Sequence, residues 1–113
     1  MNAFNGNDIN WAVLNETRRK FGGNFFRHFG YFTQDGPRSV QAIEDAMRAM
    51  NAAKMVLPAN RLAEDAFLFG AQGLGELAEL IESNAQRCVA QHETPDFLLR
   101  DVLALRPLYF TSV

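Results

Sequence analysis

The stretch PANRLAEDAFLFGA, from Pro58 to Ala71, sets the helical pattern of this sequence. Apolar residues recur here and just upstream at steps of four and three, which is the spacing of one helix face. They are Met55, Ala59, Leu62, Ala66 and Phe69. The pattern predicts a helix from about Ala52 to Phe69 that buries this face, with Gly70 as its stop signal.

A second apolar series lies upstream of this stretch, after Asn24, which can cap a helix. Its members are Phe25, Phe29, Phe32, Val40, Ile43, Met47 and Met50. Gly36-Pro37 interrupts the series, but the spacing across it keeps the same face in register. We therefore expect one long helix kinked at Pro37, with two helices joined by a tight turn as the alternative.

Two further helices are expected on either side of these. A short first helix should start after Asn7 or Asp8, both favourable caps, and end at Gly22-Gly23. Gly70, Gly73 and Gly75 are expected to break the chain before a fourth helix, whose outer glutamates, Glu76, Glu79 and Glu82, should be solvated. Its apolar series is Leu74, Leu77, Leu80, Ile81, Ala85 and Cys88.

The clearest helix start is Thr94-Pro95-Asp96, which offers a cap, a proline at the first position and an acid in the first turn. Pro107 is expected to limit the regular part of this last helix, which buries Leu98, Val102, Leu105 and Tyr109. No segment shows the alternation of apolar and polar residues that is typical of a strand. The sequence predicts an all-α protein, an up-and-down four-helix bundle capped by the short first helix. Residues 8–113 should form one domain after a tail of residues 1–7.

Composition and charge exclude several classes of function. The chain has 113 residues, 48% of them hydrophobic, and a net charge of −2, which favours a globular protein over a nucleic-acid-binding one. The basic run Arg18-Arg19-Lys20 falls near the end of an expected helix, where positive charge is stabilising. The N-terminus lacks the features of a signal peptide, and no apolar run is long enough to span a bilayer. We expect a cytoplasmic protein that binds neither nucleic acid nor membrane, as a monomer or weak homodimer.

Few residues suggest chemistry. His28, His92 and Cys88 are too few for a zinc site, and each is expected to be structural or solvent-facing. The glycine-rich segment FGAQGLGE lacks the lysine and the preceding strand of a phosphate loop. The sequence therefore predicts neither a metal nor a cofactor.

The face of the central helix opposite its apolar residues holds Asn60, Ala63, Glu64 and Phe67. Here the sequence resembles the histidine-containing phosphotransfer (HPt) domains of two-component phosphorelays. Their signature is a mid-helix His followed by Leu at +2, Lys at +3, Gly at +4, a small residue at +6 and an apolar-Gly-Ala end. This chain has Asn60, Leu62, Ala63, Glu64, Ala66, Phe69, Gly70 and Ala71 at these places.

The resemblance extends over nearly the whole chain, from about Asp8 onward. The opening INWAVL, the long aromatic helix and the segment LGELAELIE all fit the family's order of elements. In the family, the histidine takes a phosphoryl group from the aspartate of a receiver domain and later returns it. The resemblance therefore implies a helical bundle that works in a signalling relay.

The reactive positions depart from the family. The amide nitrogen of Asn60 is not nucleophilic, because its lone pair is delocalised into the carbonyl. Ala63 has no charge to neutralise a phosphoryl group, and Glu64 adds bulk and negative charge in place of glycine. These departures predict a protein that is not an enzyme and has no catalytic residue at this site.

Three functions follow from these observations. The leading one is a non-catalytic HPt-like domain that binds a response-regulator receiver domain or a histidine kinase. Its binding face would comprise Asn60, Arg61, Ala63, Glu64 and Phe67, with Phe67 as an exposed apolar anchor, unless that ring turns into the edge of the core. The alternatives are a structural or oligomerisation bundle, and an active phosphotransfer protein that uses another residue, such as one of the two histidines.

Overall fold

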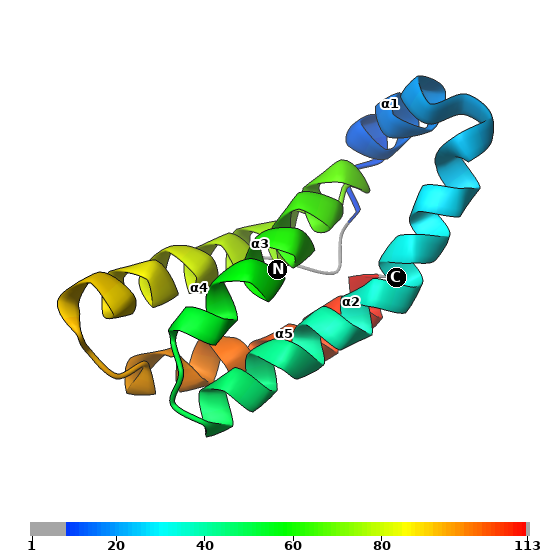
Figure 1. Cartoon of the computed structure of the whole chain (residues 1–113). Helices are drawn as coiled ribbons and strands as arrows, with labels where there is room; N and C mark the ends of the chain where they lie inside the picture. Colours follow the sequence, from blue (N-terminus) through cyan, green and yellow to red (C-terminus); the bar gives the residue numbers. More distant parts are fainter. Residues whose placement is uncertain (1–8, 113) are drawn as a thin grey trace.

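A computed structural model gives the structure of the protein, and residues 9–112 are described. Its elements in order are α1 (Trp11–Phe21), the short 3₁₀ turn η1 (Gly22–Asn24), α2 (Phe25–Arg48), α3 (Ala53–Leu68), α4 (Gln72–Gln91), the 3₁₀ turn η2 (Asp96–Leu98) and α5 (Leu99–Ser112). These residues contain no strand. Helices α2 to α5 run up and down as a bundle, and α1 lies at one end of it (Figure 1). The predicted all-α bundle with a short N-terminal helix is confirmed.

The core lies where the sequence pattern places it, along the inner faces of α2 to α5. Its largest fully buried side chains include Phe32, Ile43, Met55, Leu62, Leu74, Ile81, Leu105 and Tyr109. Cys88 is buried among them, as expected of a small apolar residue. Two residues of the predicted apolar series are instead exposed: Met50, which lies past the end of α2, and Leu80 on the outside of α4.

Helix α2 is continuous through Pro37, which confirms the expectation of one long helix. Gly36 allows α5 to approach this part of α2 closely. A Cβ on Gly36 would lie 2.3 Å from the ring of Tyr109, and the Tyr109 hydroxyl donates a 2.9 Å hydrogen bond to the carbonyl of Phe32. Burial raises the pKa of Tyr109 to about 12, so the ring stays neutral and keeps its donor proton.

Several predicted boundaries are wrong. Helix α1 begins at Trp11, after the cap Asn10; the predicted caps Asn7 and Asp8 lie outside the described residues. Gly73 and Gly75 do not break the chain but lie inside α4, where both are buried.

The two proline signals near the C-terminus also differ from expectation. Thr94-Pro95-Asp96 leads into η2, and α5 starts only at Leu99. Pro107 does not limit α5, which continues to Ser112. Its ring lies on the exposed side of the helix, while the neighbours Leu105 and Tyr109 are buried. Packing of these neighbours outweighs the local cost of a proline in a helix.

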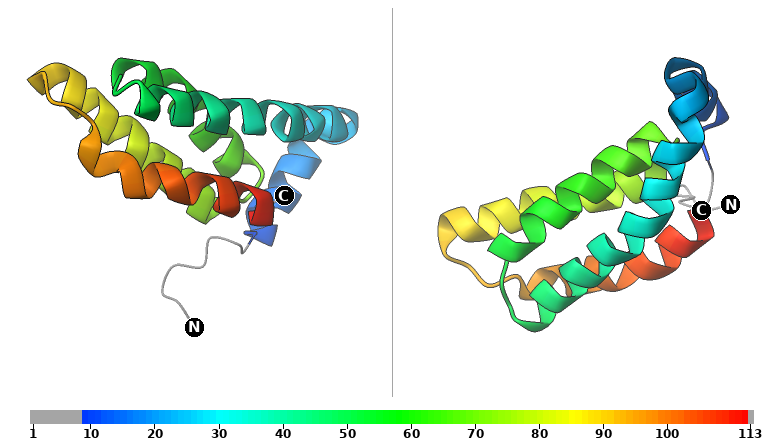
Figure 2. Two further views of the ribbon diagram at one scale, coloured as in Figure 1. Left: turned by 90° about the horizontal axis from the view of Figure 1, so that it is seen from below. Right: turned by 45° about the vertical axis from the view of Figure 1, so that its right-hand side comes forward.

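The turn between α3 and α4 connects the bundle to α1. Gly70 has φ +81°, a conformation that favours glycine, and a Cβ there would lie 2.6 Å from the carbonyl oxygen of Asn10. The amide of Asn10 donates a 2.7 Å hydrogen bond to the Gly70 carbonyl. The buried hydroxyl of Thr17 donates to the Leu68 carbonyl. Together these bonds hold α1 against the end of the bundle. Figure 2 shows α1 at this end.

The close approach of α2 and α5 gives a test of the fold. We expect Gly36→Ala to lower the free energy of unfolding by about 1–3 kcal/mol, because the new methyl group collides with the Tyr109 ring. Gly30→Ala is the matched control in the same helix. Its Cβ would meet nothing within 4 Å, so the change should stabilise by about 0.5–1 kcal/mol. Urea unfolding of both variants measures the difference, and equal effects would contradict the packing.

Candidate functional site

The five residues predicted to form one binding face lie in two different surroundings. Asn60 and Phe67 contact α4 and Ala63 is buried, whereas Arg61 and Glu64 are exposed. Ala63 is only 4% exposed, so its predicted place on an outer face is wrong. The physical reason is that α3 packs against both α2 and α4, which buries a wider arc than one apolar stripe.

Asn60 is held by a residue of the next helix. Its side-chain nitrogen donates a 3.0 Å hydrogen bond to Oε2 of Glu82, and both residues are half-buried. Glu82 was expected to be a solvated outer residue, and that expectation is wrong. Asn60 and Glu82 lie equally far in sequence from Ala71, where the antiparallel pair of helices turns. This equal spacing about the turn is the one feature of the sequence that could have predicted that Asn60 and Glu82 lie opposite each other.

Phe67 is part of the packing between α3 and α4. It is half-buried against the core. A Cβ on Gly75 would lie only 2.7 Å from the Phe67 ring, so the absence of a side chain at Gly75 makes room for the ring. The expected exposed anchor is therefore wrong, and the alternative, a ring at the edge of the core, describes this side chain.

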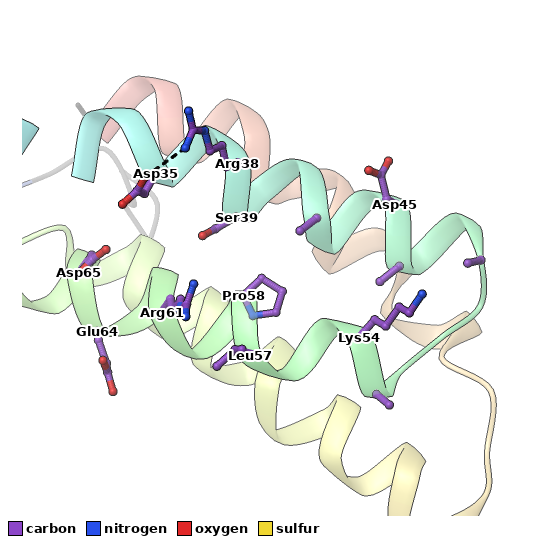
Figure 3. Close-up of a pocket in the computed structure, with 14 residues that line it drawn as sticks. Asp35, Arg38, Ser39, Asp45, Lys54, Leu57, Pro58, Arg61, Glu64 and Asp65 are labelled. Carbon is purple, nitrogen blue, oxygen red and sulfur yellow. Dashed lines mark ion pairs between the residues drawn. The ribbon is translucent and has the colours of Figure 1, made fainter. Parts of the chain in front are cut away.

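An open groove of about 1100 Å³ runs between α2 and α3 (Figure 3). Alanines line much of it: Ala42, Ala46, Ala49 and Ala53. Leu57 and Pro58 add apolar surface, and the Leu57 side chain is 58% exposed. Arg61 points into the groove, while Glu64, at its edge, points away. The predicted residues Arg61 and Glu64 thus belong to a groove that sequence reasoning missed, because it depends on the spacing of two helices.

One end of this groove is acidic. Burial raises the pKa of the Asp65 carboxyl above its ordinary value, and the nearby charges of Glu64 and Asp35 raise it further. Arg61 and His28 act in the opposite direction. Asp35 is itself in an exposed ion pair with Arg38, at 3.9 Å, which contributes little to stability.

The raised pKa of Asp65 predicts a pH-dependent stability. A carboxyl whose pKa is higher in the folded state binds protons more tightly there, so its ionisation destabilises the fold as the pH rises through the two pKa values. Asp65→Asn should therefore be more stable than the wild type at pH 7. The difference should disappear in acid, below the ordinary pKa of aspartate. Urea unfolding at pH 7 and in acid tests this, and a less stable variant at pH 7 would contradict it.

The other candidate residues form no reactive centre. The ring of His28 stacks on Phe21 with centroids 4.5 Å apart, and His92 ends α4 in a left-handed conformation, with φ +55°. Within residues 9–112, no three His, Cys, Asp or Glu side chains are grouped to hold a metal ion. None of the helices described is long and apolar enough to cross a membrane.

Comparisons of the chain with family models, curated proteins and solved structures found no match. The likeness to HPt domains therefore rests on the residues quoted from the sequence.

Proposed function

We propose that this protein is a non-catalytic HPt-like domain that binds a receiver domain or a histidine kinase without accepting a phosphoryl group. The observation that carries the proposal is the hydrogen bond between Asn60 and Glu82. It occupies the position where the family has its phosphate-accepting histidine. Here a carboxamide and a carboxylate face each other instead.

This arrangement opposes phosphoryl transfer in three ways. Asn60 offers no nucleophile. The carboxylate of Glu82, like that of Glu64, would repel a phosphoryl group by about 1 kcal/mol at about 6 Å in a high dielectric. Ala63, at the family's lysine position, is buried and provides no cation. The bundle itself is intact, which is consistent with a role in binding.

The groove between α2 and α3 is the surface that suits a partner. It lies between α3 and α2, whereas the Asn60–Glu82 pair lies between α3 and α4, and it has an apolar floor between charged edges. A partner helix could place an apolar side chain beside Leu57 and an acidic group near Arg61. This replaces the predicted role of Phe67 as the anchor.

The absence of phosphoryl transfer can be tested directly. We expect no acid-labile, base-stable label on the wild type after incubation with phosphorylated receiver domains and active histidine kinases. Asn60→His alone should gain little, because the carboxylate of Glu82 remains beside the new imidazole and repels the incoming phosphoryl group. Asn60→His combined with Glu82→Gln and Glu64→Gly should accept more phosphate. Label on the wild type would overturn the proposal, and loss of that label in His28→Gln or His92→Gln would identify the acceptor.

Partner binding requires a separate measurement. We expect at least one receiver domain or histidine kinase from the same cell to bind at micromolar concentration in isothermal titration calorimetry. Leu57→Asp and Arg61→Glu should each weaken binding about tenfold, which corresponds to about 1.4 kcal/mol. Arg87→Glu, an exposed change on α4, is the control and should have no effect. Failure of every receiver and kinase to bind would contradict the proposal.

A second function, self-association, is favoured by the outer face of α5. Leu99, Leu103 and Phe110 are exposed there, while the opposite face of the helix is buried. With Arg106 they recur at steps of four, three and four, the spacing of a coiled-coil seam. Arg106 itself pairs with Glu44 of α2 at 2.7 Å, so the apolar part of the seam is Leu99, Leu103 and Phe110. A helix that is apolar on both faces usually has a neighbour on each.

Self-association through α5 predicts a concentration-dependent dimer. Sedimentation velocity should show the wild type forming dimers as its concentration rises, and Leu103→Glu remaining a monomer. Ala104→Glu, the adjacent exposed position outside the seam, is the matched control and should still dimerise. A wild type that stays monomeric at high concentration would exclude this function.

A further inference from the structure

A second, smaller cavity lies at the end of the bundle, away from the groove between α2 and α3. It has a volume of about 310 Å³ and is formed where α1, the N-terminal part of α2 and the last turn of α5 meet. Figure 2 shows these elements at one end of the molecule. The lining side chains include Trp11, Leu14, Phe29, Phe32, Phe69 and Thr111.

The walls of this cavity are apolar and well supported. Phe69 packs against the rings of Phe29 and Phe32, with centroids 5.3 Å and 5.4 Å away. Trp11 forms an exposed rim, with 66% of its surface accessible. The hydroxyl of Thr111 donates to carbonyl groups of its own helix. The cavity therefore offers burial for an apolar group and little hydrogen bonding, and its size is at the lower end of known binding pockets.

Positive charge is concentrated in the segment of the chain that contains α1 and the start of α2. Residues 9–31 carry four Lys or Arg and one acidic residue, whereas residues 32–112 carry seven Lys or Arg and eleven Asp or Glu. Among the described residues of this basic region, the one ion pair joins Arg19 to Glu16. Trp11, Leu14 and Arg18 follow at helical spacing on one flank of α1, so Arg18 lies about 10 Å along the helix from the cavity rim.

We propose that the cavity and the basic flank of α1 form a docking site for an acidic segment of a partner protein that carries a bulky apolar side chain. The apolar side chain enters the cavity, in contact with Trp11 and Phe29. Carboxylates one to two turns away lie along α1 and interact with Arg18. The charge of the site fits an acidic partner, and the cavity gives that partner a defined position.

The shape of the site favours a protein segment over a membrane surface. Trp11, Phe26 and Tyr31 protrude from the same basic segment and could enter a membrane, but their insertion would leave the concave cavity unfilled. A side chain projecting from a peptide can enter it. This site is separate from the α2–α3 groove, so its test does not depend on the proposed function.

The test uses synthetic peptides and the whole protein. The probe is a helical peptide of Glu residues with Phe and Leu on one face, labelled with fluorescein for anisotropy. Trp11, the one tryptophan of the chain, provides an independent fluorescence signal with unlabelled peptide. We expect micromolar binding that weakens as salt is raised, because the charged groups are exposed. A peptide with Ala for Phe and Leu, and one with Lys for Glu, should each bind at least tenfold more weakly.

Protein variants locate the site. Arg18→Glu and Trp11→Ala should each weaken binding of the acidic peptide at least fivefold, with circular dichroism confirming that both variants are folded. Lys20→Glu makes the same charge change on the opposite flank of α1 and should have a smaller effect than Arg18→Glu. Arg100→Glu, at an exposed position of α5, should leave the affinity for the peptide unchanged.

Three outcomes would overturn the inference. The first is equal binding of the peptide that lacks Phe and Leu, which would show that the cavity takes no part. The second is an equal loss of affinity in Arg18→Glu, Lys20→Glu and Arg100→Glu, which would indicate a general effect of net charge. The third is binding to phosphatidylserine vesicles, but not to the peptide, which would identify a membrane surface.

Discussion

The left-handed glycine between α3 and α4 is the constraint on which the other contacts depend. Gly70 turns the chain where no side chain fits, because the Asn10 carbonyl occupies the space a Cβ would need. The turn sets α4 antiparallel to α3, which brings Glu82 opposite Asn60. The turn also binds the start of α1 through the hydrogen bond from Asn10, and so places α1 where it forms one wall of the apolar cavity. The Asn60–Glu82 pair and the end cavity both depend on this one local conformation.

Helix α3 separates two surfaces of different chemistry. On the side of α4 it is closely packed, with Phe67 against Gly75 and Asn60 hydrogen-bonded to Glu82. On the side of α2 it borders an open groove with charged edges and an alanine-lined floor. In the proposed function, α3 binds a partner through the side that carries Arg61 and not through Asn60.

The net charge also differs between two parts of the molecule. Helix α1 and the first turns of α2 carry a net positive charge, and the rest of the described chain carries a net negative charge. Such an arrangement gives the two ends of the protein different preferences for partners, since exposed charges act over only about 10 Å at moderate ionic strength. The groove and the end cavity therefore differ in the charge of the chain segments around them.

The sequence by itself determined the helical content, the core faces and the continuity of α2 through Pro37. These follow from the helical period, which fixes which residues share a face whatever surrounds it. Only the tertiary structure decided that Ala63 is buried, that Glu82 holds Asn60 and that Phe67 packs on Gly75. The period leaves the flanks of a helix undecided, because their burial depends on how closely its neighbours approach. The same packing carries α5 through Pro107 and α4 through Gly73, where local preference alone predicts an end.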